Sequence, residues 1–315
     1  MTTVEATVAS APRPLARVRD WWANPWGKPR FLVLFTALYL AWSIVPILIA
    51  IRFSFNEGRS RSTSQGWSLR WYLDDPDLSV AHDPDLRAAL FQSLQLAAIA
   101  VLVTVPLGLA LAIGLTRWRG RGSGSARAVS LLTLVTPELV MGTAFLLVFT
   151  HLLRFIELGT VAQAIGHITF SLVFVLIIVR GRLLSIGPEY EEAARDLGAS
   201  GLQAIRLALL PMLVPAIVAS GIVVFAISMD DFVISQFLSS GTTTDTVPVR
   251  IYGTGRTAPT PALNALATLT LAITVVIATI LVVLWKFVSA RQGSAESGVH
   301  ELATLADETS RFPEG

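Results

Sequence analysis

The sequence predicts an all-α integral membrane protein with six transmembrane helices. Hydrophobic residues make up 53% of its 315 positions and charged residues only 15%, whereas soluble domains usually carry about 25% charged residues. A helix needs about 20 apolar residues to cross the hydrocarbon core of a bilayer, and six stretches of the chain meet that requirement. Basic residues gather in alternate loops between these stretches, as they do in chains that cross a membrane repeatedly.

Each of the six stretches is expected to be a helix. Backbone N–H and C=O groups find no water in lipid, so a spanning segment must satisfy its own hydrogen bonds. The short alternating segments that would build a β-barrel do not occur in the sequence. The predicted spans are 31–51, 88–116, 128–150, 158–179, 207–238 and 262–285.

The loops predict how the chain is oriented, because lysine and arginine accumulate on the cytoplasmic side. The loops 117–127 and 180–206 are rich in arginine, whereas the loop 52–87 offsets its arginines with six acidic residues. Both termini are therefore predicted to be cytoplasmic. The predicted organisation is an N-terminal tail over 1–30, a transmembrane domain over 31–290 that includes a cytoplasmic loop at 181–211, and a C-terminal tail over 291–315.

Several classes of function lack their motifs in this chain. It has no cysteine, which excludes disulfides and thiolate metal sites. It has no phosphate-binding Gly-x4-Gly-Lys-Ser/Thr loop, and no His-Glu-x-x-His or Gly-x-Ser-x-Gly signature. The net charge of +2 is too small to indicate nucleic-acid binding. We therefore expect a chain that is not an enzyme and that holds no cofactor or metal of its own.

A short helix-turn-helix is predicted in the loop between the fourth and fifth spans. Pro188 suits the first position of a helix, and the glutamates that follow it are favoured near a helix N-terminus. Gly198 can end that helix in a left-handed conformation. Ser200 and Gln203 then form the pattern of a capping box, which begins a second helix.

Within this loop the triplet Glu192-Ala193-Ala194 combines a charge with two small side chains that permit close approach of a partner. Alone, the triplet is ordinary helix sequence. Together with Gly198 and the dipeptide Leu210-Pro211, it resembles the EAA loop of the membrane subunits of ABC importers, the binding-protein-dependent transport permeases. In that family the loop forms a coupling helix that docks on a cytoplasmic ATPase. The resemblance implies the docking residues Glu192, Ala193, Ala194, Gly198, Leu210 and Pro211.

The resemblance covers most of the membrane part of the chain, with one departure. Ala208 stands where the family usually has isoleucine. The segments 53–56, 228–232 and 264–268 resemble the second membrane subunit of spermidine/putrescine transporters. The resemblance implies an ABC type I importer permease fold and a polyamine substrate. Iron, sulfate or another small solute stays open as an alternative, as does an ion-coupled secondary carrier.

The resemblance also implies partners. Energy would come from a homodimer of ABC ATPase subunits that binds ATP and Mg. A second, related or identical permease subunit is expected, because we detect no internal repeat and six spans are few for a transporter that works alone. An extracytoplasmic solute-binding protein would deliver the solute. The expected location is the bacterial cytoplasmic (inner) membrane.

Three acidic residues inside predicted spans are candidates for the substrate pathway: Glu138, Asp230 and Asp231. A charge at the bilayer centre costs at least about 2.5–3.5 kcal/mol, so it should face the bundle interior or water. Pro137 predicts a kink beside Glu138. Neighbouring positions on a helix point about 100° apart, so one aspartate would line the path while the other pairs locally. The alternatives are a buried ion pair for Glu138 and a helix break at the aspartates, and His167 is expected to be a satisfied buried histidine.

Overall fold

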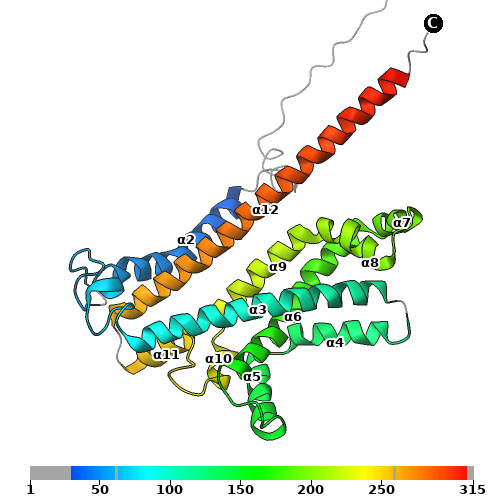
Figure 1. The fold of residues 1–315 in the computed structure, drawn as a ribbon. Coiled ribbons are helices and arrows are strands. Elements are labelled where there is room, and N and C mark those ends of the chain that lie inside the picture. Colours follow the sequence, from blue (N-terminus) through cyan, green and yellow to red (C-terminus); the bar gives the residue numbers. More distant parts are fainter. Residues whose placement is uncertain (1–29, 61–62, 119, 258–259, 311–315) are drawn as a thin grey trace, which may run out of the picture. The chain divides into compact units, whose positions relative to one another are not determined.

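The computed structural model describes residues 30–60, 63–118, 120–257 and 260–310 (Figure 1). Within these ranges the regular structure is helical, apart from one antiparallel bridge between Asn56 and Trp67. The predicted N-terminal tail lies outside the described residues except for Arg30. The chain divides into a unit over 1–52 and a unit over 53–315, and each is described by itself.

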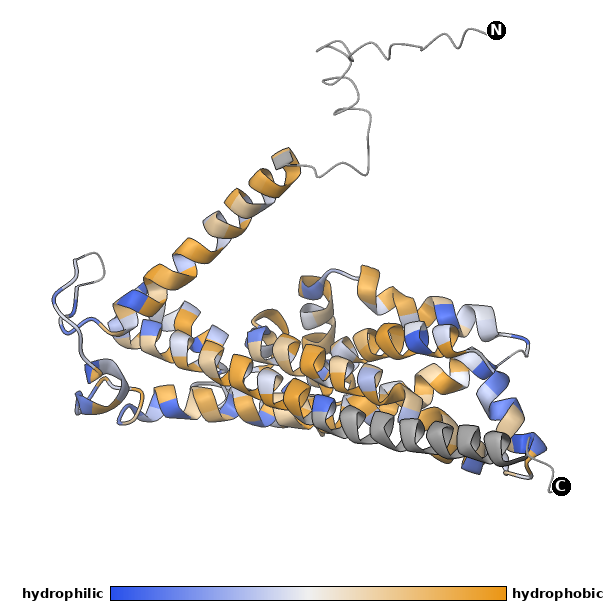
Figure 2. Cartoon of the chain, turned by 90° about the horizontal axis from the view of Figure 1, so that it is seen from above, coloured by the Kyte–Doolittle hydropathy of each residue, from blue (hydrophilic) through white to orange (hydrophobic). Residues whose placement is uncertain are grey.

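Five helices are long and apolar enough to cross a membrane, and the count is six if one bent pair of helices is taken as a single span. Hydrophobic residues cover most of their length in Figure 2, and hydrophilic residues gather toward helix ends and connecting loops. Counted in that way, the number agrees with the six spans predicted from the sequence. The helices are α2 (Arg30–Ser54), α3 (Pro84–Arg117), the pair α4 (Ser123–Val135) and α5 (Glu138–Leu147), α6 (Thr160–Ile186), α9 (Leu210–Asp230) and α12 (Pro261–Ser310).

The prediction of one continuous third span over 128–150 is wrong. Helix α4 ends at Val135, α5 begins at Glu138, and the two are bent by 104°. Thr136 has an extended backbone, with ψ 126°, because a residue before proline is disfavoured in the helical region. The predicted kink at Pro137 is therefore a full break. A π-helical segment, η2 (Val148–Leu152), continues α5.

The predicted fifth span, 207–238, is also divided. Its helix begins earlier, because α8 (Gly201–Gln203) and the π-helical η3 (Ala204–Leu209) run without interruption into α9. It ends at Asp230, where Asp231 takes an extended backbone conformation with ψ 118°. A separate helix, α10 (Val233–Leu238), follows. The helix break that the sequence left as an alternative is thus present.

Two further elements differ from the predicted scheme. The loop 239–261 contains a helix, α11 (Val247–Thr257). The backbone of α12 remains helical through Ser310, so most of the predicted C-terminal tail continues the last helix.

The hydrophobic core of the second unit lies where α3, α6 and α9 pack together, and Figure 1 shows these helices side by side. Small residues permit the close packing of membrane helices. A Cβ atom added at Gly108 of α3 would lie 2.6 Å from the Cβ atom of Val175 in α6. Only glycine fits at this crossing, whereas Gly114 of the same helix has open space around its Cα.

The segment between α2 and α3 is fixed by its own polar contacts. Trp71 of the short π-helix η1 (Arg70–Asp74) is fully buried, and its indole nitrogen donates to the carbonyl of Asn56 at 2.6 Å. Burial raises the pKa of the Asp75 carboxyl, but hydrogen bonds from the backbone N–H of Leu78, from Arg70 and from the backbone N–H of Asp77 outweigh it and hold the pKa below its ordinary value. The Arg70–Asp75 ion pair closes at 2.9 Å.

Replacing Gly108 by alanine is expected to lower the free energy of unfolding by about 1–3 kcal/mol, because the added methyl group overpacks the α3–α6 crossing. Gly114→Ala in the same helix is the matched control and should be neutral or stabilising, since alanine favours a helix by about 1 kcal/mol over glycine. Thermal unfolding in detergent measures both. Equal effects of the two substitutions would contradict the packing argument.

The Asp75 carboxyl is expected to make the segment 70–83 sensitive to acid. Because its pKa is lowered on folding, its stabilising contribution is present above the unfolded pKa of about 3.9 and is lost as the pH falls through the lower folded pKa. Hydrogen exchange of the Leu78 amide, corrected for intrinsic rate, should therefore speed up below about pH 4. Asp75→Asn should abolish this pH dependence, and the exposed neighbour Asp74→Asn should retain it. An unchanged profile in Asp75→Asn would refute the assignment.

Candidate functional site

The two helix breaks bring the three predicted acidic residues together. Glu138 is the first residue of α5, Asp230 is the last residue of α9, and Asp231 follows it. Helix α10 packs against α5 and α6. All three carboxylates line one cavity of about 200 Å³, together with Phe170 and Phe232 among others.

The two aspartates have different surroundings, as their positions on a helix predict. Asp230 is exposed on the cavity, whereas Asp231 is only 6% exposed. The Oδ2 atom of Asp231 accepts hydrogen bonds from the backbone N–H of Ser235 at 2.8 Å and from its hydroxyl at 2.7 Å. The Oδ1 atom of Asp231 is buried and accepts no hydrogen bond from the described residues. One carboxylate therefore pairs locally while the other faces open space.

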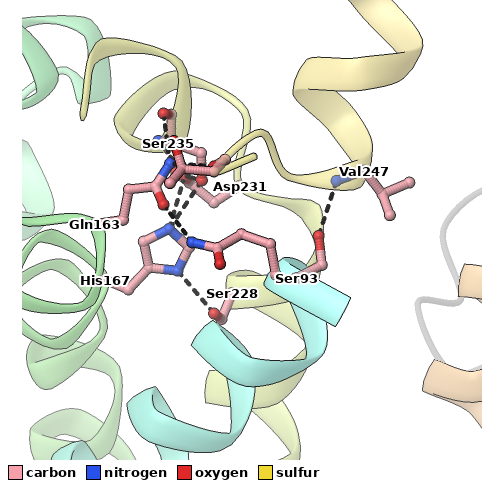
Figure 3. A network of polar contacts seen from close by, with 9 residues as sticks. Ser93, Gln163, His167, Ser228, Asp231, Ser235 and Val247 are labelled. Carbon is pink, nitrogen blue, oxygen red and sulfur yellow. Dashed lines mark hydrogen bonds and ion pairs between the residues drawn. The ribbon is translucent and has the colours of Figure 1, made fainter. Parts of the chain in front are cut away.

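A buried histidine completes the surroundings of Asp231 (Figure 3). His167 of α6 is 2% exposed, and its Nε2 lies 3.1 Å from Oδ2 of Asp231 and 3.0 Å from the hydroxyl of Ser235. Its Nδ1 lies 2.7 Å from the hydroxyl of Ser228. Both ring nitrogens of His167 therefore have polar partners within hydrogen-bond distance. His167 is thus the satisfied buried histidine that the sequence suggests.

Two glutamines extend this network to other helices, and sequence reasoning missed Gln163. The side-chain amide of Gln163 in α6 donates to the carbonyls of Ser235 and Thr244 at 3.0 Å each. Its oxygen accepts from Gln92 of α3 at 2.7 Å. The hydroxyl of Ser93, beside Gln92, accepts from the backbone N–H of Val247 at 2.9 Å (Figure 3). The only sequence signal was a polar side chain within an apolar run.

Asp230 also lines a second, larger cavity of about 790 Å³ formed by α9, α11 and α12. The wall is mostly apolar and contains the aromatic pair Phe232 and Tyr252, whose ring centroids are 4.8 Å apart. The guanidinium of Arg256 lies 4.3 Å from the centre of the Tyr252 ring. Aromatic faces attract cations, and the Tyr252 ring already holds the cation of Arg256, so Asp230 is the group of this wall that can pair with a cationic solute.

The predicted helix-turn-helix is present. Helix α7 spans Glu189–Asp196 and follows Pro188, one residue later than expected. Gly198 takes the left-handed conformation, with φ +89°. Ser200 and Gln203 form the predicted capping box, in which the Ser200 N–H donates to the Gln203 side chain at 2.8 Å and the Gln203 N–H to the Ser200 hydroxyl at 3.4 Å.

Helix α7 presents the predicted triplet outward and buries a different glutamate. Glu192 and Ala193 are exposed and Ala194 is half-buried, whereas Glu191 is only 4% exposed and pairs with Arg117 at the end of α3. Sequence reasoning missed this pairing. Of the remaining motif residues, Gly198 is exposed in the turn after α7, and Leu210 and Pro211 begin α9.

Comparison with known proteins supports the fold and identifies the family. Residues 104–293 match the binding-protein-dependent transport system inner membrane component family. The putrescine transport system permease protein PotI of Escherichia coli is 33% identical over 253 residues, which are 79% of this chain and 86% of the relative. The spermidine/putrescine transport system permease protein PotC of Escherichia coli is 35% identical over 241 residues, which are 76% and 88% of the two chains.

Solved structures give the same fold at low sequence identity. A bacterial ABC transporter involved in the import of the acidic polysaccharide alginate aligns with a TM-score of 0.65 at 17% identity, over 86% of this chain and 96% of that chain. The same type of transporter in complex with an alginate pentasaccharide-bound periplasmic protein gives a TM-score of 0.61 at 18% identity, over 86% and 94%. The predicted ABC importer permease fold is confirmed. The chain belongs to the binding-protein-dependent transport system inner membrane component family, the membrane-spanning permeases of ABC importers.

Proposed function

We propose that this permease conducts a polyamine such as spermidine or putrescine across the cytoplasmic membrane. The observation that carries the proposal is the convergence of Glu138, Asp230 and Asp231 on one cavity at two broken helices. A polyamine is a flexible polycation that loses its hydration in a low-dielectric layer, and carboxylates facing its path offset that loss. The polyamine permeases PotI and PotC are relatives of the chain.

Asp230 would be the carboxylate that a polyamine meets in both cavities. It lines the 200 Å³ cavity with Glu138 and the 790 Å³ cavity with Tyr252. Charged ammonium groups can pair with the carboxylate while the methylene segments contact the apolar and aromatic wall. The same carboxylates would repel sulfate, so an anionic solute fits this pathway poorly.

The exposed face of α7 would dock a homodimer of ATPase subunits that supplies ATP and Mg. The residues proposed for coupling are Glu192, Ala193, Ala194 and Gly198, with Leu210-Pro211 joining the loop to α9. This function would require the loop and both termini to lie in the cytoplasm. A second, related permease would complete the transporter. An extracytoplasmic binding protein would deliver the solute, and the alginate ABC transporter has been solved in complex with a periplasmic protein.

Neutralising the pathway acids should reduce uptake of polyamines more than assembly. In proteoliposomes that contain the whole transporter and its binding protein, Glu138→Gln and Asp230→Asn are each expected to lower spermidine uptake about tenfold, which corresponds to about 1.4 kcal/mol of lost stabilisation. The exposed Glu157→Gln is the matched control and should transport normally. Stimulation of ATP hydrolysis by another solute, with none by spermidine, would overturn the polyamine assignment.

Substitutions in the coupling face should release the ATPase. Glu192→Lys reverses the exposed charge, and Gly198→Val places a β-branched residue in the left-handed conformation, which strains the turn by about 1–2 kcal/mol. Both are expected to abolish co-purification of the ATPase and uptake. Gly181→Ala is the control, because Gly181 of α6 has nothing within 4 Å of an added Cβ and an ordinary helical backbone. Normal ATPase binding in both coupling variants would show that α7 is not the docking element.

A further inference from the structure

Helix α3 carries an ion pair near each of its ends. It has 34 residues and is therefore about 51 Å long at 1.5 Å per residue. Its last residue, Arg117, pairs with Glu191 of α7, and its second residue, Asp85, pairs with Arg250 of α11. One continuous helix thus connects the element proposed to bind the ATPase with the element that walls the larger cavity.

The pair at the α7 end is well suited to hold the two helices together. The Glu191 side chain is 5% exposed, and the Arg117 side chain is 32% exposed. Arg195 approaches the other carboxylate oxygen of Glu191 at 4.0 Å, but its side chain is 55% exposed. A buried carboxylate that loses its partner is strongly destabilised, so displacement of α7 must take the end of α3 with it or break a costly contact.

The distinction between Glu191 and its neighbours comes from helix geometry. Successive residues on a helix point about 100° apart, so Glu191 faces α3 while Glu192 faces away from the core. Glu189 is also exposed, and no ion pair is found for it among the described residues. Glu191 therefore contacts α3 and is not part of the proposed docking face, although it belongs to the same short helix.

The pair at the α11 end reaches the wall of the larger cavity. The Arg250 side chain is 16% exposed and that of Asp85 is 47% exposed. Arg250 lies between Val247 and Tyr252, which both line the 790 Å³ cavity. The hydroxyl of Ser93 in α3 also accepts a hydrogen bond from the backbone of Val247. Helix α3 is thus joined to α11 at two separate points.

We propose that α3 is a strut that couples α7 to α11, with Glu191, Arg117, Asp85 and Arg250 as its positioning residues. Movement of α7 is passed through the Arg117–Glu191 pair to α3 and through the Asp85–Arg250 pair to the wall of the solute cavity. Its close packing on α6 and α9 keeps α3 from bending freely between the two ends. This inference rests on the proposed docking of the ATPase on α7.

A double-mutant cycle on the whole reconstituted transporter tests the first pair. Glu191→Gln and Arg117→Gln should each lower uptake and the stimulation of ATP hydrolysis by loaded binding protein about tenfold, a typical size for coupling between sites, while the ATPase still co-purifies. The double neutral variant should be no worse than either single one, because both remove the same contact. The charge exchange Glu191→Arg with Arg117→Glu should recover much of the loss. Glu189→Gln is the matched control and should behave like the unmodified chain.

A variant that combines substitutions at both ends of α3 gives a sharper test. Substitutions at distant sites normally have additive effects. Substitutions in two contacts that act in series along one strut should not, because losing either contact already interrupts the coupling. Glu191→Gln combined with Arg250→Gln should therefore reduce stimulation no further than the worse single variant. Additive losses, normal coupling in Glu191→Gln, or no recovery on charge exchange would each overturn the strut. If a single variant assembles poorly, recovery of uptake in the charge-exchanged variant tests the strut in its place.

The outcome also separates this inference from the proposed docking face. If Glu192→Lys fails to release the ATPase, the proposed docking on α7 is wrong. If Glu192→Lys releases the ATPase while Glu191→Gln couples normally, docking stands and the strut is wrong.

Discussion

The arrangement of the pathway depends on how the break after α9 is satisfied. A break in a membrane helix frees backbone groups that lipid cannot hydrate, so protein groups must take their place. Asp231 does this for α10 by accepting the backbone N–H of Ser235, and Gln163 donates to the carbonyl of the same residue. The N–H of Gly159 donates to the carbonyl of Leu238 at 2.8 Å at the other end of α10. The polar residues of this region are thus required by the backbone as well as by any solute.

That requirement explains why the two aspartates have separate roles. Asp231 is committed to the break, and His167 and Ser235 hold its Oδ2 atom. Asp230 closes the last turn of α9, its carboxylate has no hydrogen bond or ion pair among the described residues, and it lines both cavities. A single carboxylate could not both stabilise the break and accompany a moving cation. In the proposed pathway, two adjacent carboxylates would divide these tasks because the helix ends between them.

Much of this organisation is predictable from sequence, and the remainder depends on tertiary contacts. Apolar length predicts the spans, and the capping box at Ser200 predicts where the helix leading into α9 begins. The 104° bend at Pro137 could not be predicted, because proline in a membrane helix is compatible with a mild kink as well as a full break. The burial of Glu191 could not be predicted from the sequence either. Three glutamates in one short helix look equivalent until the position of Arg117 selects one of them.

The helix that contains α9 joins the two functional regions by a direct route. It runs without interruption from Gly201 to Asp230 over 30 residues, or about 45 Å, so the capping box of the proposed coupling loop and the proposed pathway carboxylate belong to one continuous helix. Near its beginning, η3 replaces the α-helical pattern with a π-helical one over Ala204–Leu209. Such segments are rare and are frequently found at functional sites. Helix α7 packs against η3, so in the proposed mechanism the helix that contains α9 and the helix α3 would provide two parallel connections between α7 and the cavities.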